Sequence, residues 1–147
     1  MNKREIVKAL MDAVQKGDFE DAGSMLSDDF RFSGLYPTPI NAKAWLNMSA
    51  SMKAAFPDLD YHFKVIGTEG DVVKTTTQLS GTHHAPFDLT GMDMGLIPAT
   101  HKTFSAALQK TKITVKENKI SLWAVEPTEG ADLTAVLSQL GVKPSSM

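Results

Sequence analysis

A histidine at the end of a predicted strand is the strongest candidate for chemistry in this chain. His83 closes the run Gly81-Thr82-His83, and strand register places its side chain on a face shared with Thr75, Thr77 and Leu79. We assign that face to a cavity. An imidazole there is suited to act as a general base or to orient a ligand, because it titrates near neutral pH. The alternative is a structural histidine whose ring bonds the backbone of a loop.

A carboxylate and a second histidine complete the set of polar candidates. Glu126 ends the predicted final strand on its inward parity, which makes it a second acid–base candidate, with a solvated strand end as the alternative. His101 lies at the end of a long predicted loop and either faces a ligand or is solvated. His62 alternates with apolar residues, which favours exposure or a dimer contact over catalysis.

Other kinds of site lack the residues that they need. The chain has no cysteine, which excludes disulfides, thiolate catalysis and cysteine metal ligands. In the group His83, His84 and Asp88, the two adjacent histidines point to opposite faces of a strand, so we expect no metal site. Neither a phosphate-cradling glycine motif nor a nucleophile elbow is present, and we expect no cofactor.

Apolar and sulfur-containing side chains suggest what a ligand would contact. We predict an apolar chamber of adaptable shape, with ordinary core packing of the same residues as the alternative. Its candidate wall residues are Tyr36, Trp45, Met48, Met52, Phe63, Phe87, Met92, Met94 and Phe104. Met92 and Met94 belong to the stretch 84–101, which carries glycines and prolines and no convincing strand or helix. A loop this long is often a lid or a partner surface.

Length and charge restrict the class of protein. A chain of 147 residues fits one domain, residues 1–147, with a sizeable core. A hydrophobic content of 42% and a formal net charge of -2 argue against disorder and against a nucleic-acid partner. The segment 1–16 interleaves charged and apolar residues, so it predicts neither a signal peptide nor a membrane span. We expect a soluble, cytoplasmic protein.

Hydrophobic periodicity indicates the elements that position these residues. A central hairpin over 56–83 turns at Glu69-Gly70-Asp71 and follows three helices. The predicted helices cover 2–17, 18–26, 41–55 and 132–141, and further strands cover 30–33, 102–115 and 120–126. Apolar parity switches within 102–115, which predicts a β-bulge near Lys110 or Thr111. The pattern is that of an α+β domain with helices covering one concave face of a curved antiparallel or mixed sheet.

A set of short motifs, in this order and spacing, resembles the SnoaL-like branch of the nuclear transport factor two-like superfamily across nearly the whole chain. The motifs are the helix 19–26 followed by Asp29-Phe30, then Ala54-Ala55-Phe56-Pro57-Asp58-Leu59, Gly70-Asp71, Gly81-Thr82-His83, Pro98-Ala99-Thr100-His101-Lys102 and Gln139-Leu140-Gly141. The resemblance implies a cone-shaped α+β barrel with an apolar pocket between helices and sheet. It also implies a homodimer formed through the sheet.

The resemblance further implies a chemistry. Members include small polyketide cyclases, which close rings without a cofactor by using a general base and a hydrogen-bond donor in a dry pocket. Such members commonly carry a polar cluster in the last strand, where this chain has Leu122-Trp123-Ala124-Val125 and lacks the usual acid. Two hypotheses follow: a cofactor-independent cyclase or isomerase that acts on a small, largely apolar carbonyl compound, and a non-catalytic ligand carrier or dimerisation module.

Overall fold

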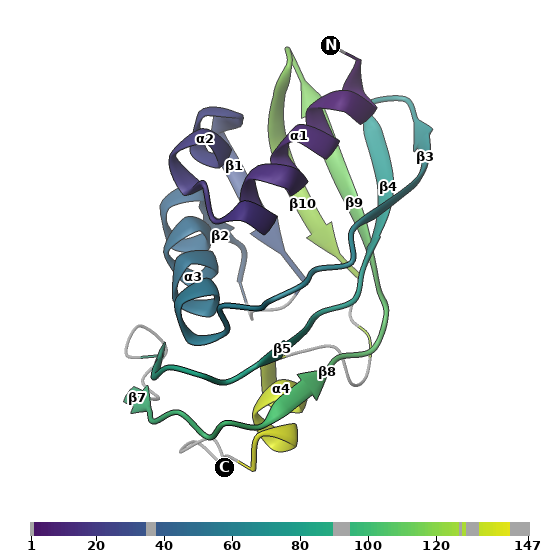
Figure 1. Ribbon diagram of the computed structural model, residues 1–147. Helices are drawn as coiled ribbons and strands as arrows, with labels where there is room; N and C mark the ends of the chain where they lie inside the picture. Colours follow the sequence, from purple (N-terminus) through teal and green to yellow (C-terminus); the bar gives the residue numbers. More distant parts are fainter. Residues whose placement is uncertain (1, 35–37, 90–94, 127, 129–132, 142–147) are drawn as a thin grey trace.

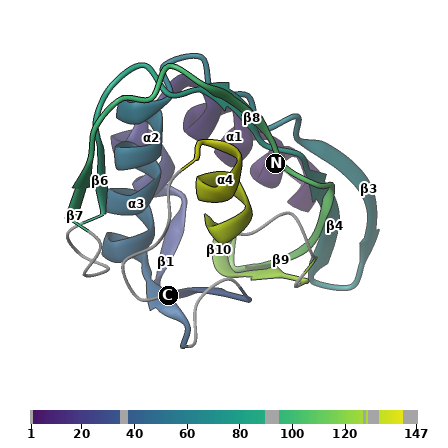
Figure 2. The ribbon, with the colours of Figure 1, turned by 90° about the horizontal axis from the view of Figure 1, so that it is seen from below.

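A curved six-stranded sheet carries the fold of the computed structural model, which describes residues 2–34, 38–89, 95–126, 128 and 133–141 (Figure 1). The strand order is β2 (Ile40–Asn41), β1 (Leu26–Ser33), β10 (Lys119–Val125), β9 (Gln109–Lys116), β4 (Val72–Thr77) and β3 (Lys64–Glu69). Strands β1 and β10 are parallel, and the other neighbours are antiparallel. The sheet curves around the interior and does not close, so it forms an open cone (Figure 2).

Three helices cover the concave side of this sheet, as the sequence predicts. They are α1 (Lys3–Lys16), α2 (Phe19–Ser24) and α3 (Ala42–Ala55). Helix α1 begins with a capping box between Asn2 and Glu5 and ends at Gly17, whose φ of 81° is the left-handed conformation that glycine adopts easily. Its apolar face is buried against the sheet. The predicted α+β architecture is therefore confirmed.

A second layer of short strands lies beyond the main sheet. Strand β5 (Ser80–Thr82) pairs with β8 (Thr103–Ser105), and β6 (Phe87–Leu89) pairs with β7 (Gly95–Ile97). The β6–β7 ladder lies within 84–101, so the expectation of a stretch without strands is wrong. Helix α4 (Leu133–Gln139) is held to β8 by the Gln139 side chain, which bonds the Ser105 backbone N–H and C=O at 2.8 and 2.9 Å.

The predicted β-bulge near Lys110 or Thr111 is wrong, because β9 pairs with β4 in unbroken register through both residues. The parity of buried residues shifts instead where the chain leaves β8 and enters β9. There the Ala106 N–H donates to the Leu79 carbonyl at 2.8 Å, outside any strand. The register irregularity of this pair of hairpin strands lies in β10, between Ile120 and Leu122.

Two of the motifs that carry the family resemblance meet in space. The Asp58 carboxylate accepts a hydrogen bond from the Thr82 N–H at 2.8 Å, and this bond lowers the pKa of Asp58. The rings of Phe56 and His83 lie 5.3 Å apart. At Gly81, an added Cβ would lie 3.3 Å from the Phe56 Cβ, which leaves little room for a side chain. The two motifs therefore join the end of α3 to β5.

Within the described ranges, every helix is too short or too polar to cross a membrane.

Candidate functional site

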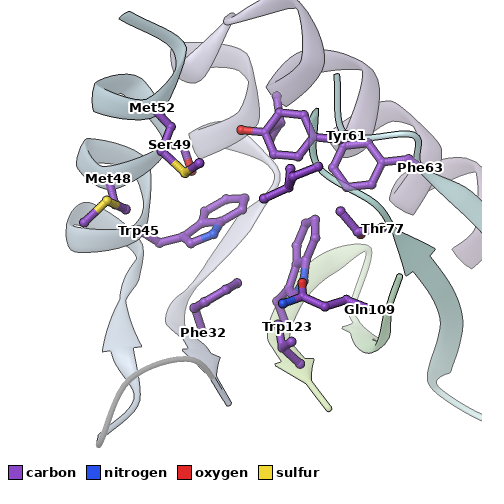
Figure 3. Close-up of a pocket in the computed structure, with 13 residues that line it drawn as sticks. Phe32, Trp45, Met48, Ser49, Met52, Tyr61, Phe63, Thr77, Gln109 and Trp123 are labelled. Carbon is purple, nitrogen blue, oxygen red and sulfur yellow. The ribbon is translucent and has the colours of Figure 1, made fainter. Parts of the chain in front are cut away.

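A cavity of about 90 Å³ lies between helix α3 and the concave face of the sheet (Figure 3). It is surrounded by side chains from helices α1 and α3 and from four strands of the main sheet. The segments just before β3 and just after β4 contribute as well. They are Val14, Phe32, Trp45, Met48, Ser49, Met52, Tyr61, Phe63, Thr77, Leu79, Gln109, Trp123 and Val125. The cavity therefore lies between the helical layer and the concave face of the sheet.

Aromatic rings form most of its wall. Trp45 on α3 lies 5.2 Å from Trp123 on β10 and 6.0 Å from Phe32 on β1, measured between ring centroids. Phe63 completes the wall at 5.9 Å from Trp123 and stacks on Tyr61 at 4.8 Å. Strand alternation explains why β1 and β10 each present an aromatic ring to the interior, where such rings pack in tilted or offset pairs.

Four polar side chains interrupt this apolar wall: Ser49, Tyr61, Thr77 and Gln109. Burial raises the pKa of the Tyr61 phenol above its ordinary value, so the phenol stays protonated and can donate a hydrogen bond. In Figure 3 its oxygen is directed toward helix α3. Thr77 is 6% exposed, and its Oγ1 has no hydrogen-bond partner among the described residues.

The lining that the structure describes contains no Asp, Glu, His, Lys or Arg. Tyr61 is its one titratable group. A buried charge without a partner costs much free energy, so this lining suits a neutral ligand. The described part of the chain also lacks any group of three or more His, Cys, Asp or Glu side chains placed to hold a metal ion.

Four of the wall residues predicted from the sequence do surround the cavity, namely Trp45, Met48, Met52 and Phe63. Two others, Phe87 and Phe104, are buried elsewhere, with ring centroids 5.4 and 5.0 Å from that of Phe56. Tyr36, Met92 and Met94 lie outside the described residues. The predicted wall residues that the structure describes therefore divide between a cavity under α3 and a buried aromatic cluster around Phe56.

His83 belongs to the buried cluster around Phe56 and does not line this cavity. It is fully buried, and its Nδ1 accepts a hydrogen bond from the Thr100 N–H at 3.2 Å, which places the proton of the neutral ring on Nε2. Nε2 has no partner of normal hydrogen-bond geometry within the described ranges. Burial lowers the pKa of His83, with the backbone of Ala85 acting in the opposite direction.

The remaining polar candidates lie at the surface. The Glu126 side chain is exposed and borders a hollow on the outer face of the sheet, together with Lys74, Lys110 and Lys112. His101 is exposed as well and has a φ of 58°. The structure thus brings neither Glu126 nor His101 together with His83 at the cavity.

Sequence reasoning missed several residues of the cavity, most notably Phe32, Tyr61, Gln109 and Trp123. Their signal was strand parity. Tyr61 shares the parity of Phe63, and Gln109 pairs with Thr77, whose side of the strand is predicted to face the cavity. For Trp123, the family resemblance indicates only a place in the last-strand motif. Parallel pairing of β1 with β10, which sets Phe32 opposite Trp123, has no local signal in the sequence.

Comparison with known proteins places this geometry in context. The family model described as SnoaL-like polyketide cyclase matches residues 4–140. The search of curated proteins found no match.

Solved structures with the same fold are numerous but distant in sequence. A candidate SnoaL-like polyketide cyclase from Jannaschia sp. CCS1 has a TM-score of 0.74 at 20% identity, over 97% of this chain and 93% of that one. IdmH, a candidate polyketide cyclase from Streptomyces antibioticus, has a TM-score of 0.71 at 23% identity, over 97% and 100%. An epoxide hydrolase of the LEH-like type from M. tuberculosis has a TM-score of 0.62 at 18% identity, over 93% and 90%.

Proposed function

Because this chain belongs to the SnoaL-like polyketide cyclase family, we propose that its cavity under α3 binds a small, uncharged, largely apolar carbonyl compound. The observation that carries the proposal is the described lining itself, in which aromatic rings and methionines surround a few neutral polar groups. Ligand sites are commonly built in this way, with apolar walls and a small number of placed hydrogen-bonding groups.

The size of the cavity restricts the ligand. Drug-sized ligands occupy pockets of about 300–1,000 Å³, and this cavity measures about 90 Å³. A cavity of about 150 Å³ holds benzene, so a ligand of one ring requires a small outward movement of this wall. A larger one requires the half-buried side chains of Met48 and Met52 to move, which unbranched methionine side chains do readily.

A second candidate function is cofactor-free ring closure or isomerisation of the same ligand. The protonated Tyr61 phenol favours it, since a donor aimed at a carbonyl oxygen stabilises the enolate that forms when a neighbouring carbon loses its proton. The described lining holds no carboxylate or imidazole to take that proton, so it passes to water or to a group outside this lining. A carrier, by contrast, binds the ligand and releases it unchanged.

The two tryptophans of the chain give a direct test, since both line the cavity. We expect one-ring ketones such as acetophenone to shift both indole N–H signals in a protein NMR titration. Glu126→Gln and His83→Asn serve as controls, because neither side chain borders the cavity. Both variants should bind within about 2-fold of the parent protein, as expected for changes away from the contact.

The proposal would be contradicted if no neutral one-ring compound shifted the two indole N–H signals. Turnover is a separate measurement. Conversion of a bound diketone to a cyclised product, lost in Tyr61→Phe with binding retained, would support the second candidate function over a carrier.

A further inference from the structure

Thr77 is the one residue in the cavity wall whose hydroxyl is buried without a hydrogen bond to any described residue. It ends β4, where it pairs with Gln109 of β9, and Figure 3 shows it beside Phe63, Gln109 and Trp123. A buried hydroxyl that bonds nothing is unfavourable, because water satisfied it in the unfolded chain. Its retention in an apolar wall therefore needs a reason.

A neighbouring threonine shows that the strand itself is not that reason. Thr75 lies two residues earlier on the same face of β4, and its Oγ1 is hydrogen-bonded to the Oγ1 of Thr111 on β9. Both hydroxyls are fully inside the protein, at 0% and 3% exposure. The sheet thus satisfies one inward threonine with a cross-strand partner and leaves the hydroxyl of the next one buried in the cavity wall without a described partner.

We propose that the Thr77 hydroxyl donates a hydrogen bond to the oxygen of the bound ligand, and so selects neutral carbonyl compounds over hydrocarbons of the same shape. The inference rests on the proposed function of the cavity. A carbonyl oxygen accepts the donor that the protein leaves unpaired, whereas a hydrocarbon keeps it unpaired and dry. A charged carboxylate gains the same bond but loses its hydration with no cation in the described lining.

A matched pair of probes isolates this hydrogen bond. Acetophenone and ethylbenzene have nearly the same shape, and only the first carries an acceptor. We expect the parent protein to bind acetophenone about 10-fold more tightly, as one hydrogen bond to an otherwise unpaired buried group implies. The readout is again the pair of indole N–H signals from Trp45 and Trp123.

Three variants assign the preference to Thr77. Thr77→Val removes the hydroxyl and keeps the shape, so the affinities of the two probes should become equal to within about 2-fold. Thr77→Ser keeps the hydroxyl and should keep the preference. Thr76→Val makes the same chemical change one residue earlier, on the opposite face of the strand, and should behave like the parent protein.

The outcomes separate the inference from the function on which it rests. Equal binding of both probes by the parent protein, or a preference that survives in Thr77→Val, would overturn the inference while leaving a ligand-binding cavity. Equal binding would also indicate that a trapped water, and not the ligand, satisfies Thr77. Binding of neither probe would overturn the proposed function and the inference together.

Discussion

Trp45 of helix α3 and Trp123 of strand β10 approach to 5.2 Å between ring centroids, and this contact joins the helical layer to the sheet beside the cavity. Each side chain is at least 94% buried. Trp45→Ala should therefore destabilise the protein by about 3 kcal/mol or more, from lost apolar burial and an enlarged void. Urea unfolding measures the change.

Leu96→Ala is the matched control for that variant, because Leu96 is 62% exposed. Its loss should change the free energy of unfolding by less than about 0.5 kcal/mol. A cost as small as this for Trp45→Ala would mean that α3 is not held to the sheet by this contact.

Thr75 and Thr77 should respond to the same substitution with opposite sign. Thr75→Val breaks the hydrogen bond to the buried Thr111 hydroxyl and should cost about 1–3 kcal/mol. Thr77→Val removes a hydroxyl that has no described partner, so ligand-free protein should become more stable by up to about 1 kcal/mol. Thermal unfolding of the two variants, without ligand, checks the prediction. Equal destabilisation of both would show that Thr77 is hydrogen-bonded in solution.

His83 should make the protein less stable in mild acid. Burial lowers the pKa of His83 in the folded state below its ordinary value of 6.5, so the unfolded chain binds the proton more readily. The free energy of unfolding should therefore fall as the pH drops below about 6.5, until the folded state is protonated as well. His83→Asn keeps an acceptor for the Thr100 N–H and removes the titration.

Unfolding of the parent protein and of His83→Asn between about pH 5 and pH 8 measures this effect. The stability of the variant should depend less on pH over that range. His62→Asn is the control, since its ring is exposed. The same pH dependence in the parent protein and His83→Asn would contradict the prediction.

The homodimer that the family resemblance implies remains a proposal, and the outer face of the sheet gives it a testable property. Lys74 lies directly opposite Lys112 in the register of β4 and β9, and Lys110 is on the same face. In a dimer with a two-fold axis through this face, these three lysines would lie close to the same lysines of the partner. Dimerisation should therefore strengthen as salt rises from about 0.05 to 0.5 M, because salt screens the repulsion.

Sedimentation equilibrium at several salt concentrations measures that trend. Lys112→Thr should reduce the salt dependence. Lys8→Thr removes the same charge from an exposed position of α1 and should leave the salt dependence unaltered. Weaker association at higher salt would contradict an interface on this face of the sheet, because it would mean that opposite charges attract across the interface.

The sequence was sufficient for the architecture because its signals are local. Asn2, Glu5 and Gly17 delimit α1, and the alternation of apolar residues identifies the strands that face the helices. The cavity depended on contacts between distant segments. Extending the register of β4 into β5 predicts His83 at the cavity, but these strands belong to different sheets. Periodicity counts residues along one strand and carries no information about where the pairing partner changes.

Glu126, at the end of β10, shows the same limit of strand periodicity. Its parity with Leu122 and Ala124 predicts an inward side chain, yet Trp123 and Val125 are the residues of β10 that line the cavity, and Glu126 lies just beyond the strand. A shift of one residue exchanges the two faces of a strand. Trp45, Met48 and Met52 of α3 escaped this difficulty, because a single helix with one buried face has no partner strand to misplace.

The bond between Asp58 and Thr82, with Phe56 and His83 beside it, has a consequence for tracing the ancestry of such chains. Two of the motifs that carry the family resemblance form a structural joint away from the cavity under α3. Shared motifs of this kind indicate a shared fold. Two chains with the same motifs can still bind different ligands. A ligand is therefore better inferred from the residues that line the cavity under α3 than from these motifs.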